Sequence, residues 1–201
     1  MFINSNMRFH HTLDDLLGNP LRLRVLRLLA RSPSQGFTGR ELARLCGASP
    51  SQTILALQSL EESGIVGREV AGPAHVWRIS RHHILSEHLI RLFQEEERSL
   101  ERLKSELQRA MARLPVKRSL IFGSVARREE RPASDIDLFV EVRSLPDKDR
   151  VEATLTAATV TTSIRFGNPL SALVLTNDQV RRNSNPSLIQ NILREGVPVT
   201  P

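Results

Sequence analysis

The stretch IFGSVARREERPASDIDLFV, residues 121–140, decides the fold of the carboxy-terminal third of the chain. A short buried strand over residues 119–122 is expected to lead through the pair Gly123-Ser124 into a helix-compatible segment. Glycine lets an anion approach the backbone, and free N–H groups and a serine hydroxyl can donate hydrogen bonds to it. The order strand, Gly-Ser, helix therefore predicts a phosphate-binding turn, although Gly-Ser pairs also occur in ordinary turns.

The second half of this stretch places two carboxylates two residues apart. In a strand from Asp135 to Val142 the side chains alternate between faces, so Asp135 and Asp137 project to the same side. At about 4 Å and an effective dielectric constant of about 20, two negative charges repel by roughly 4 kcal/mol. A divalent cation turns this repulsion into binding, and Mg²⁺ prefers carboxylate oxygens together with substrate phosphates. The pair predicts metal-assisted nucleotidyl or phosphoryl transfer, although Asp-x-Asp alone also occurs on solvated edge strands.

Gly123-Ser124 followed by Asp135-Ile136-Asp137 closely resembles the minimal nucleotidyltransferase family of the DNA polymerase beta superfamily. The resemblance is close over residues 117–142 and looser as far as residue 201. It implies that Asp135 and Asp137 are the catalytic carboxylates and bind one or two Mg²⁺ (or Mn²⁺) ions. It also implies a nucleoside triphosphate substrate, with ATP expected. An acceptor hydroxyl would take its nucleoside monophosphate and release pyrophosphate.

The same resemblance gives roles to the residues around the Gly-Ser pair. Gly123 and Ser124 would hold the triphosphate of the incoming nucleotide. Arg127 would steady phosphate charge, or would instead be a surface arginine of the following helix. Arg128 stands where many family members have glycine, and it could crowd the site.

A further departure concerns the third carboxylate that family enzymes usually bring from a later strand. The candidate strand, residues 170–176, carries no acid, and Ser171 stands near the expected place. Glu141 lies on the carboxylate face but four residues from Asp137, about 13 Å along the strand. Glu152 and Asp178 lie outside the strand. A site with two carboxylates could bind a magnesium nucleotide and yet catalyse transfer poorly or not at all.

The amino-terminal third predicts three helices followed by a strand pair. The first helix starts at Asn19-Pro20, the second opens at Thr38, and the third starts at Ser49-Pro50. Two strand-like runs then follow over residues 65–70 and 75–79. Residues 37–80, FTGRELARLCGASPSQTILALQSLEESGIVGREVAGPAHVWRIS, carry a resemblance to the winged-helix transcriptional-regulator superfamily that covers residues 12–80.

This resemblance makes residues 49–63 the recognition helix and residues 68–78 the wing. The helix has no Lys or Arg and carries Glu61 and Glu62, so phosphate neutralisation must come from elsewhere. The alternative is that this domain binds protein rather than DNA. The candidate phosphate contacts are Arg40, Arg44, Arg68 and Arg78, and the candidate base contacts are Ser51, Gln52 and Thr53.

A long helix is expected to connect the two parts. Residues 84–114 contain neither Gly nor Pro, and leucines recur at steps of three, four or seven between charged residues. This narrow apolar seam fits a short coiled coil that forms a homodimer, and equally a linker helix that packs on its own domains. The seam consists of Leu85, Leu89, Leu92, Leu100, Leu103, Leu107 and Leu114.

Composition agrees with an anionic partner. The formal charge of +6 favours nucleic acid or nucleotide phosphate. Cys46 is the only cysteine, so no internal disulfide is possible, and the six histidines have no zinc-ligand spacing. Neither a membrane-spanning run nor a signal peptide is recognisable, which makes the cytoplasm the expected location.

The expected fold is α+β: a winged helix-turn-helix domain over residues 12–81, a connecting helix over residues 82–114, and a small mixed α/β nucleotidyltransferase-like domain over residues 115–201. The leading hypothesis is a metal-dependent nucleotidyltransferase coupled to DNA binding. The alternative is a DNA-binding transcriptional regulator whose degenerate nucleotidyltransferase domain senses nucleotide or binds a partner. A third possibility follows from the resemblance alone, because minimal nucleotidyltransferases often pair with a separate helical toxin-type protein.

Overall fold

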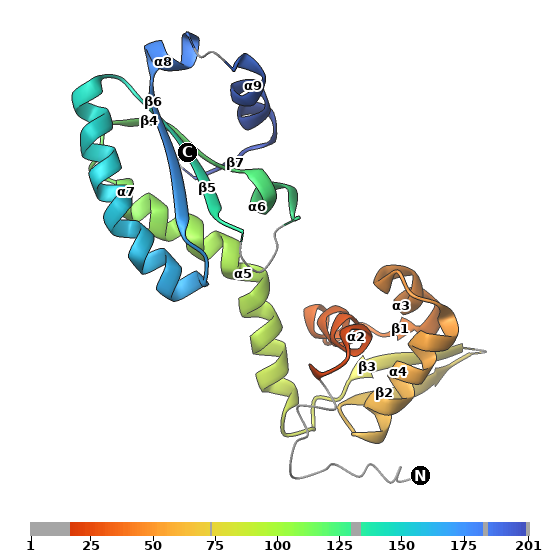
Figure 1. Cartoon of the computed structure of the whole chain (residues 1–201). Helices are drawn as coiled ribbons and strands as arrows, with labels where there is room; N and C mark the ends of the chain where they lie inside the picture. The colour runs from red at the N-terminus through yellow and green to blue at the C-terminus, as the bar shows by residue number, and fades with distance from the viewer. Residues whose placement is uncertain (1–16, 73, 130–133, 183–184, 200–201) are drawn as a thin grey trace. The chain divides into compact units, whose positions relative to one another are not determined.

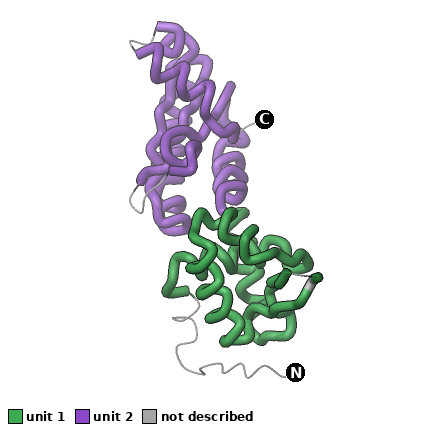
Figure 2. Tube along the Cα trace, turned by 90° about the vertical axis from the view of Figure 1, so that its right-hand side faces the viewer, with its two compact units in different colours: residues 1–98 green, residues 99–201 purple. Residues whose placement is uncertain are grey.

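The computed structural model describes residues 17–72, 74–129, 134–182 and 185–199. It divides into two compact units, residues 1–98 and 99–201 (Figure 2). The division falls inside helix α5 (Ser86–Met111), so the first half of the predicted connecting helix belongs to one unit and the second half to the other. Residues 12–16 of the predicted winged-helix domain lie outside the described residues, as does Glu130 of the segment behind Gly123-Ser124.

The first unit has the predicted winged-helix arrangement (Figure 1). Three helices precede a β-hairpin, and the sheet is completed by a strand of two residues that the sequence had not indicated. The sheet is antiparallel with strand order β1-β3-β2. The elements are α2 (Pro20–Arg31), β1 (Phe37–Thr38), α3 (Gly39–Cys46), α4 (Pro50–Glu62), β2 (Val66–Ala71) and β3 (Ala74–Ile79).

The three helices begin where their capping residues predict. The Asn19 side chain accepts a hydrogen bond from the Leu21 N–H at 2.9 Å. Thr38 and Glu41 form a capping box, and the Ser49 hydroxyl accepts from the backbone of the third residue of α4. Each cap satisfies backbone donors that the first helical turn leaves unpaired.

The core of the first unit is built from these helices and the sheet. Leu26 and Leu29 of α2, Leu57 of α4 and Trp77 of β3 are buried together. Phe93 of α5 joins the same cluster, so the start of the long helix is part of this core.

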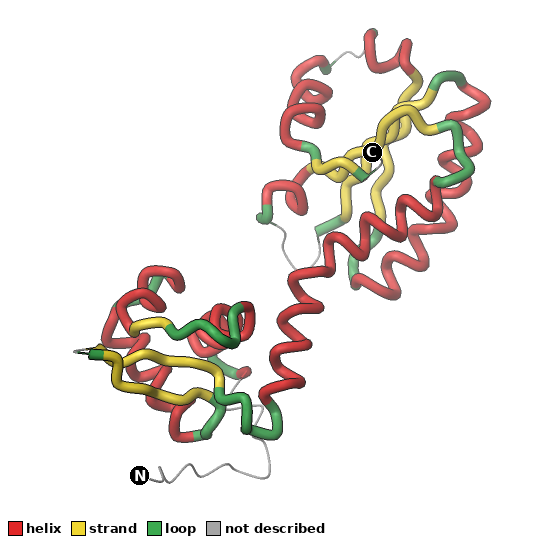
Figure 3. The backbone as a smooth tube through the Cα atoms, turned by 180° about the vertical axis from the view of Figure 1, so that it is seen from behind, coloured by secondary structure: helices red, strands yellow, loops and turns green. Residues whose placement is uncertain are grey.

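The second unit is built on a four-stranded sheet (Figure 3). The strand order is β6-β5-β4-β7, with β5 and β6 parallel and the other pairs antiparallel. The predicted strand over residues 170–176 is confirmed, and the predicted strand at Asp135 begins one residue later. The strands are β4 (Val116–Phe122), β5 (Ile136–Val142), β6 (Leu170–Thr176) and β7 (Val197–Pro198), and the helices are α6 (Gly123–Arg127), α7 (Leu145–Phe166), α8 (Asn177–Arg181) and α9 (Pro186–Glu195).

Helices cover both faces of this sheet, so that successive side chains of β5 are buried alternately in two different apolar clusters. Leu138 and Val140 pack with Leu107 of α5 and Leu155 of α7 on one side. Phe139 points to the other side and packs with Ile192 of α9. Because β5 lies between β4 and β6, its backbone is paired on both edges and its apolar residues are buried on both faces.

Most leucines of the predicted seam, which extends beyond both ends of α5, pack in the cores of the two units. Leu89 is buried in the core of the first unit, and Leu103 and Leu107 are buried in the core of the second. Leu92 alone of the seven is among the exposed large apolar residues, at 53%. The reading of a helix packed on its own domains accounts for the buried leucines, and dimerisation through this helix stays a prediction. No helix in the described ranges has both the length and the apolar character needed to cross a membrane.

Candidate nucleotide site and candidate nucleic-acid interface

The antiparallel pairing of β4 and β5 brings Gly123 against Asp137. Phe122, the last residue of β4, is the register partner of Asp137. A Cβ atom on Gly123 would lie 2.2 Å from Asp137 Oδ2, and Gly123 has a φ of +70°. Glycine is therefore required here for two reasons, the left-handed backbone and the close approach of the carboxylate.

The two aspartates form a small, negatively charged site. Asp135 is exposed just before β5, and Asp137 is half-buried within it. Burial raises the pKa of Asp137 above its usual value, the charge of Asp135 raises it further, and Arg127 opposes both. Burial and a neighbouring like charge are the features that mark functional carboxylates.

The segment that carries Asp135 is held by the loop in front of β6. Asn168 Nδ2 donates to the Ser134 carbonyl oxygen at 2.7 Å, and the Ile136 N–H donates to the Pro169 carbonyl oxygen at 2.8 Å. Asn168 thus holds the backbone next to Asp135, and it was not among the residues predicted from the sequence. A hydrogen bond to a distant backbone carbonyl leaves no signature in sequence spacing.

Serine occupies the place where a third carboxylate was sought. In the parallel pairing of β5 and β6, Ser171 is the register partner of Asp137. Within the described residues, no three His, Cys, Asp or Glu side chains are grouped so that they could hold a metal ion. Two carboxylates are oxygen ligands suited to Mg²⁺ when a nucleotide supplies further oxygens.

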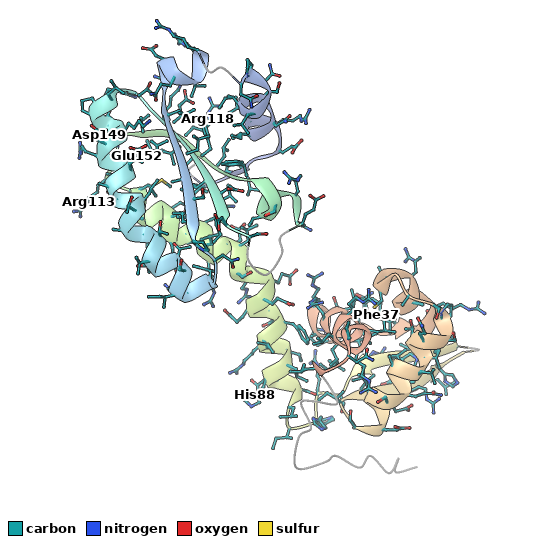
Figure 4. All side chains as sticks on the ribbon, in the orientation of Figure 1. Phe37, His88, Arg113, Arg118, Asp149 and Glu152 are labelled. Atoms are coloured by element: carbon teal, nitrogen blue, oxygen red, sulfur yellow. The ribbon has the colours of Figure 1, made fainter. Side chains whose placement is uncertain are left out.

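The other acids considered for this role are engaged elsewhere. Glu141 is buried, with Lys117 Nζ at 2.7 Å and Arg118 Nε at 3.4 Å from its carboxylate oxygens. Glu152 lies on α7 and pairs with Lys148 one turn earlier (Figure 4). Because two cations neutralise Glu141, its charge is not available at the Asp135-Asp137 site.

The remaining predicted residues of this site lie on or beside α6. Ser124 is the second residue of α6, and its carbonyl oxygen accepts from the Glu129 N–H at 2.9 Å. Arg127 is exposed, and its Nε donates to a Glu129 carboxylate oxygen at 2.9 Å. Arg128 is exposed and left-handed, with a φ of 59°. Glycine would suit position 128 because of this backbone conformation. The Arg128 side chain itself is exposed to solvent.

A pocket of about 250 Å³ lies beside this turn, between α6 and α9. One wall is formed by the end of β4 and by α6. The opposite wall is one face of α9. Its lining residues from α9 are Leu188, Asn191, Ile192 and Glu195.

In the first unit, the start of α4 presents two of the three predicted base contacts. Ser51 and Gln52 are exposed, whereas Thr53 is fully buried. The Thr53 hydroxyl donates to the Ser49 carbonyl oxygen at 2.9 Å. The prediction that Thr53 addresses base edges is therefore wrong, because the helical period turns this position into the core.

The predicted phosphate contacts fall into two groups. Arg68 Nε lies 3.2 Å from a Glu61 carboxylate oxygen, and its guanidinium stands 5.5 Å from the centre of the Trp77 ring. Arg78 is paired with Glu69. Both wing arginines are therefore paired with a carboxylate. Arg68 also reduces the negative charge that Glu61 gives to the predicted recognition helix.

The other two predicted contacts lie on α3. Arg40 and Arg44 are exposed, and neither forms an ion pair with any residue that the structure describes. Both are placed to add positive charge near α4, since α3 packs against α4.

Comparisons with known proteins agree with this division of the chain. Residues 101–200 match the family described as Polymerase beta, Nucleotidyltransferase, and residues 23–69 match the family described as IclR helix-turn-helix domain. No curated protein sequence matches the chain significantly.

Several solved structures of transcriptional regulators are similar to part of the chain. The AntR antimony-specific transcriptional repressor is 27% identical, covers 46% of this chain and 78% of its own, and has a TM-score of 0.37. A possible transcriptional regulatory protein fragment from Mycobacterium bovis is 25% identical, with 47% and 99% covered and a TM-score of 0.34. The MarR family regulator SPO1453 from Silicibacter pomeroyi is 23% identical, with 51% and 74% covered and a TM-score of 0.37.

The family matches and the topology of each unit lead to the same assignment. The first unit has the order of helices and strands of a winged helix, and the second carries the Gly-Ser turn and the two aspartates beside a mixed sheet. The chain joins a winged helix-turn-helix domain to a nucleotidyltransferase domain of the polymerase beta family.

Proposed function

We propose that the second unit is a metal-dependent nucleotidyltransferase that transfers a nucleoside monophosphate from a nucleoside triphosphate to a hydroxyl acceptor. The observation that carries the proposal is the contact of Gly123 with Asp137, because it sets the expected phosphate turn against a carboxylate. Asp135 adds a second negative charge at the same place. A bound Mg²⁺ or Mn²⁺ would neutralise both carboxylates and withdraw charge from the α-phosphate.

The chain's own residues would divide the work as follows. Asp135 and Asp137 would hold the cation, whose charge would offset the cost of keeping the half-buried Asp137 ionised. Gly123 leaves space for the Asp137 carboxylate, and the Ser124 hydroxyl would donate to the phosphate oxygens. Arg127 is free to turn from Glu129 towards phosphate, because both side chains are exposed. In the reaction, a bond forms between the acceptor oxygen and the α-phosphorus as the bond to pyrophosphate breaks, and the hydroxyl proton is released to solvent.

A second candidate function is favoured by Ser171. With serine beside Asp137 and Glu141 neutralised by Lys117 and Arg118, the site offers two carboxylates in place of three. Such a site binds a magnesium nucleotide without activating an acceptor. The chain would then be a regulator in which nucleotide binding changes the affinity for DNA.

One experiment separates these two functions. Purified protein is incubated with Mg²⁺ and α-labelled ATP, alone and with candidate acceptors, beside Asp135→Asn and Asp137→Asn. Label that transfers with the wild-type protein and not with either variant supports the enzyme. Saturable binding of ATP that needs both aspartates, without transfer, supports the regulator. Binding that survives both substitutions contradicts both functions.

We further propose that the first unit binds DNA. Ser51 and Gln52 stand exposed at the start of α4, and Arg40 and Arg44 offer charge for phosphates. The formal charge of +6 supports attraction to a polyanion.

The test is a mobility shift at several salt concentrations. We expect affinity to fall steeply with salt, and Arg44→Ala to reduce the slope of log K against log salt by about 0.9 if it neutralises one phosphate. Arg91→Ala, which removes an arginine paired with Glu87 on α5, serves as the matched control. Absence of any shift at low salt would contradict DNA binding.

A further inference from the structure

The pocket between α6 and α9 shares a wall with the aspartate site. α9 packs against α6, and Gly123 lines the pocket. The same glycine is the residue whose Cβ position would overlap Asp137. A ligand whose phosphates are held at Asp137 can therefore extend along Gly123 into the pocket.

The size of the pocket limits what it can take. Its volume of about 250 Å³ is below the roughly 300–1,000 Å³ of sites that enclose drug-sized ligands. It suits one planar ring system better than a whole nucleotide. The triphosphate would remain outside, at the Gly-Ser turn.

The walls of the pocket combine apolar surface, the amide of Asn191 and the charged side chains of Arg127 and Glu195. Phe122 comes from the end of β4, and Leu188 and Ile192 come from α9. Nucleobases stack on such aromatic and aliphatic side chains and are distinguished by hydrogen bonds at their edges. Asn191 stands among these apolar residues and is the neutral polar side chain of the lining.

The orientation of the Asn191 amide is set by its neighbour. Arg194 donates to Asn191 Oδ1 at 3.2 Å, which leaves Nδ2 as a donor and the second lone pair of Oδ1 as an acceptor. An amide in this state pairs with adenine through N7 and the N6 amino group. Guanine has an oxygen in place of the amino group, so it would set O6 against Oδ1.

On these grounds we propose that the pocket between α6 and α9 takes the adenine base of the nucleoside triphosphate, and that Asn191 selects adenine over guanine. This assignment rests on the proposed binding of a metal nucleotide at Asp135 and Asp137. It adds a base-specific subsite made by α9, a helix that lies outside the motif of residues 117–142.

The test measures binding of three probes by calorimetry in the presence of Mg²⁺: ATP, GTP and inorganic tripolyphosphate. The wild-type protein should bind ATP at least about fivefold more tightly than either other probe, since one bidentate pair discriminates by about 5-fold to 140-fold. Asn191→Leu should remove the preference for ATP over GTP and leave the tripolyphosphate affinity unchanged. Gln190→Leu, the same change at the exposed neighbouring position outside the pocket, should keep the preference.

A second variant tests whether the base occupies the pocket, independently of the Asn191 amide. Leu188→Trp should fill the pocket and lower the ATP affinity to that of tripolyphosphate, and thermal unfolding shows whether each variant is folded. An ATP preference that persists in Asn191→Leu and Leu188→Trp would overturn the base subsite while the metal-triphosphate site stands. A protein that binds none of the three probes would overturn the proposed nucleotide site itself.

Discussion

Replacement of Gly123 by alanine tests the closest contact in the candidate site. The substitution forces a side chain onto a backbone with a φ of +70°, which costs about 1–2 kcal/mol. The new Cβ would also lie 2.2 Å from Asp137 Oδ2 and 3.1 Å from its Cγ, so the carboxylate must move. Overpacking of this kind costs about 1–3 kcal/mol. The two effects together predict a loss of about 2–5 kcal/mol in the stability of the second unit.

A matched control is available in the same unit. Gly167 also has a left-handed backbone, with a φ of +80°, but no atom outside its own neighbours lies within 4 Å of its Cβ position. Gly167→Ala should therefore cost only the backbone part, about 1–2 kcal/mol. The difference between Gly123→Ala and Gly167→Ala measures the contact with Asp137.

The measurement is urea unfolding followed by far-UV circular dichroism. Trp77 is the only tryptophan and belongs to the core of the first unit, so its fluorescence should show an unchanged transition in both variants. In an Asp137→Ala background the nearest remaining side-chain atom to the new methyl group is the Cβ of residue 137 at 3.4 Å, and Gly123→Ala should cost no more than Gly167→Ala. Equal costs for the two glycines in the wild-type background would refute the reasoning.

Three further predictions concern single residues. Asp137→Asn should stabilise the metal-free protein at pH 7, because the raised pKa of Asp137 means that its ionisation opposes folding. Urea unfolding at several pH values should show the gain shrink as the pH falls through the folded-state pKa. The gain should disappear about one unit below the unfolded-state pKa of about 3.9, where the carboxyl is protonated in both states. Arg128→Gly should raise stability by about 0.5–1 kcal/mol, since relief of the left-handed backbone exceeds the entropy gained by the unfolded chain; a loss of stability in the melting curve would contradict this. Thr53→Val should destabilise the first unit by about 1 kcal/mol through loss of the bond to Ser49, while the DNA sequence selected from a random pool stays the same.

Much of the fold follows from local rules that the sequence displays. Asn19, Thr38 and Ser49 cap helices where they were expected, because a cap acts within three residues of its own position. The alternation along β5 was also predictable, because successive side chains of any strand point to opposite faces of the sheet.

What the sequence did not predict depends on contacts between distant segments. Helix α7 was not anticipated, although Ser144 caps it and Gly167 ends it, because its run of Thr and Ala has no clear apolar stripe. The neutralisation of Glu141 by Lys117 joins residues on two strands. Thr53 was misassigned because the helical phase that buries it is fixed by packing against α2 and α3.

In the candidate site, too, the local sequence motif was predictable and the contacts between distant segments were not. The motif supplied Gly123, Asp135 and Asp137, and the structure adds that the first and the last of these touch. Asn168 could not be found from spacing, since it donates to the carbonyl of Ser134, which is distant in the chain. Asn191 lines the pocket beside Gly123 only because α9 packs against α6.

The most direct test of the central claim is a crystal structure of the protein with Mn²⁺ and a non-hydrolysable ATP analogue, in which anomalous scattering locates the cation. The account predicts a peak about 2.1–2.2 Å from oxygen atoms of both Asp135 and Asp137, with the triphosphate against Gly123 and Ser124. A cation and nucleotide bound away from these two aspartates, or aspartates that still face solvent without metal at saturating Mn²⁺, would contradict it.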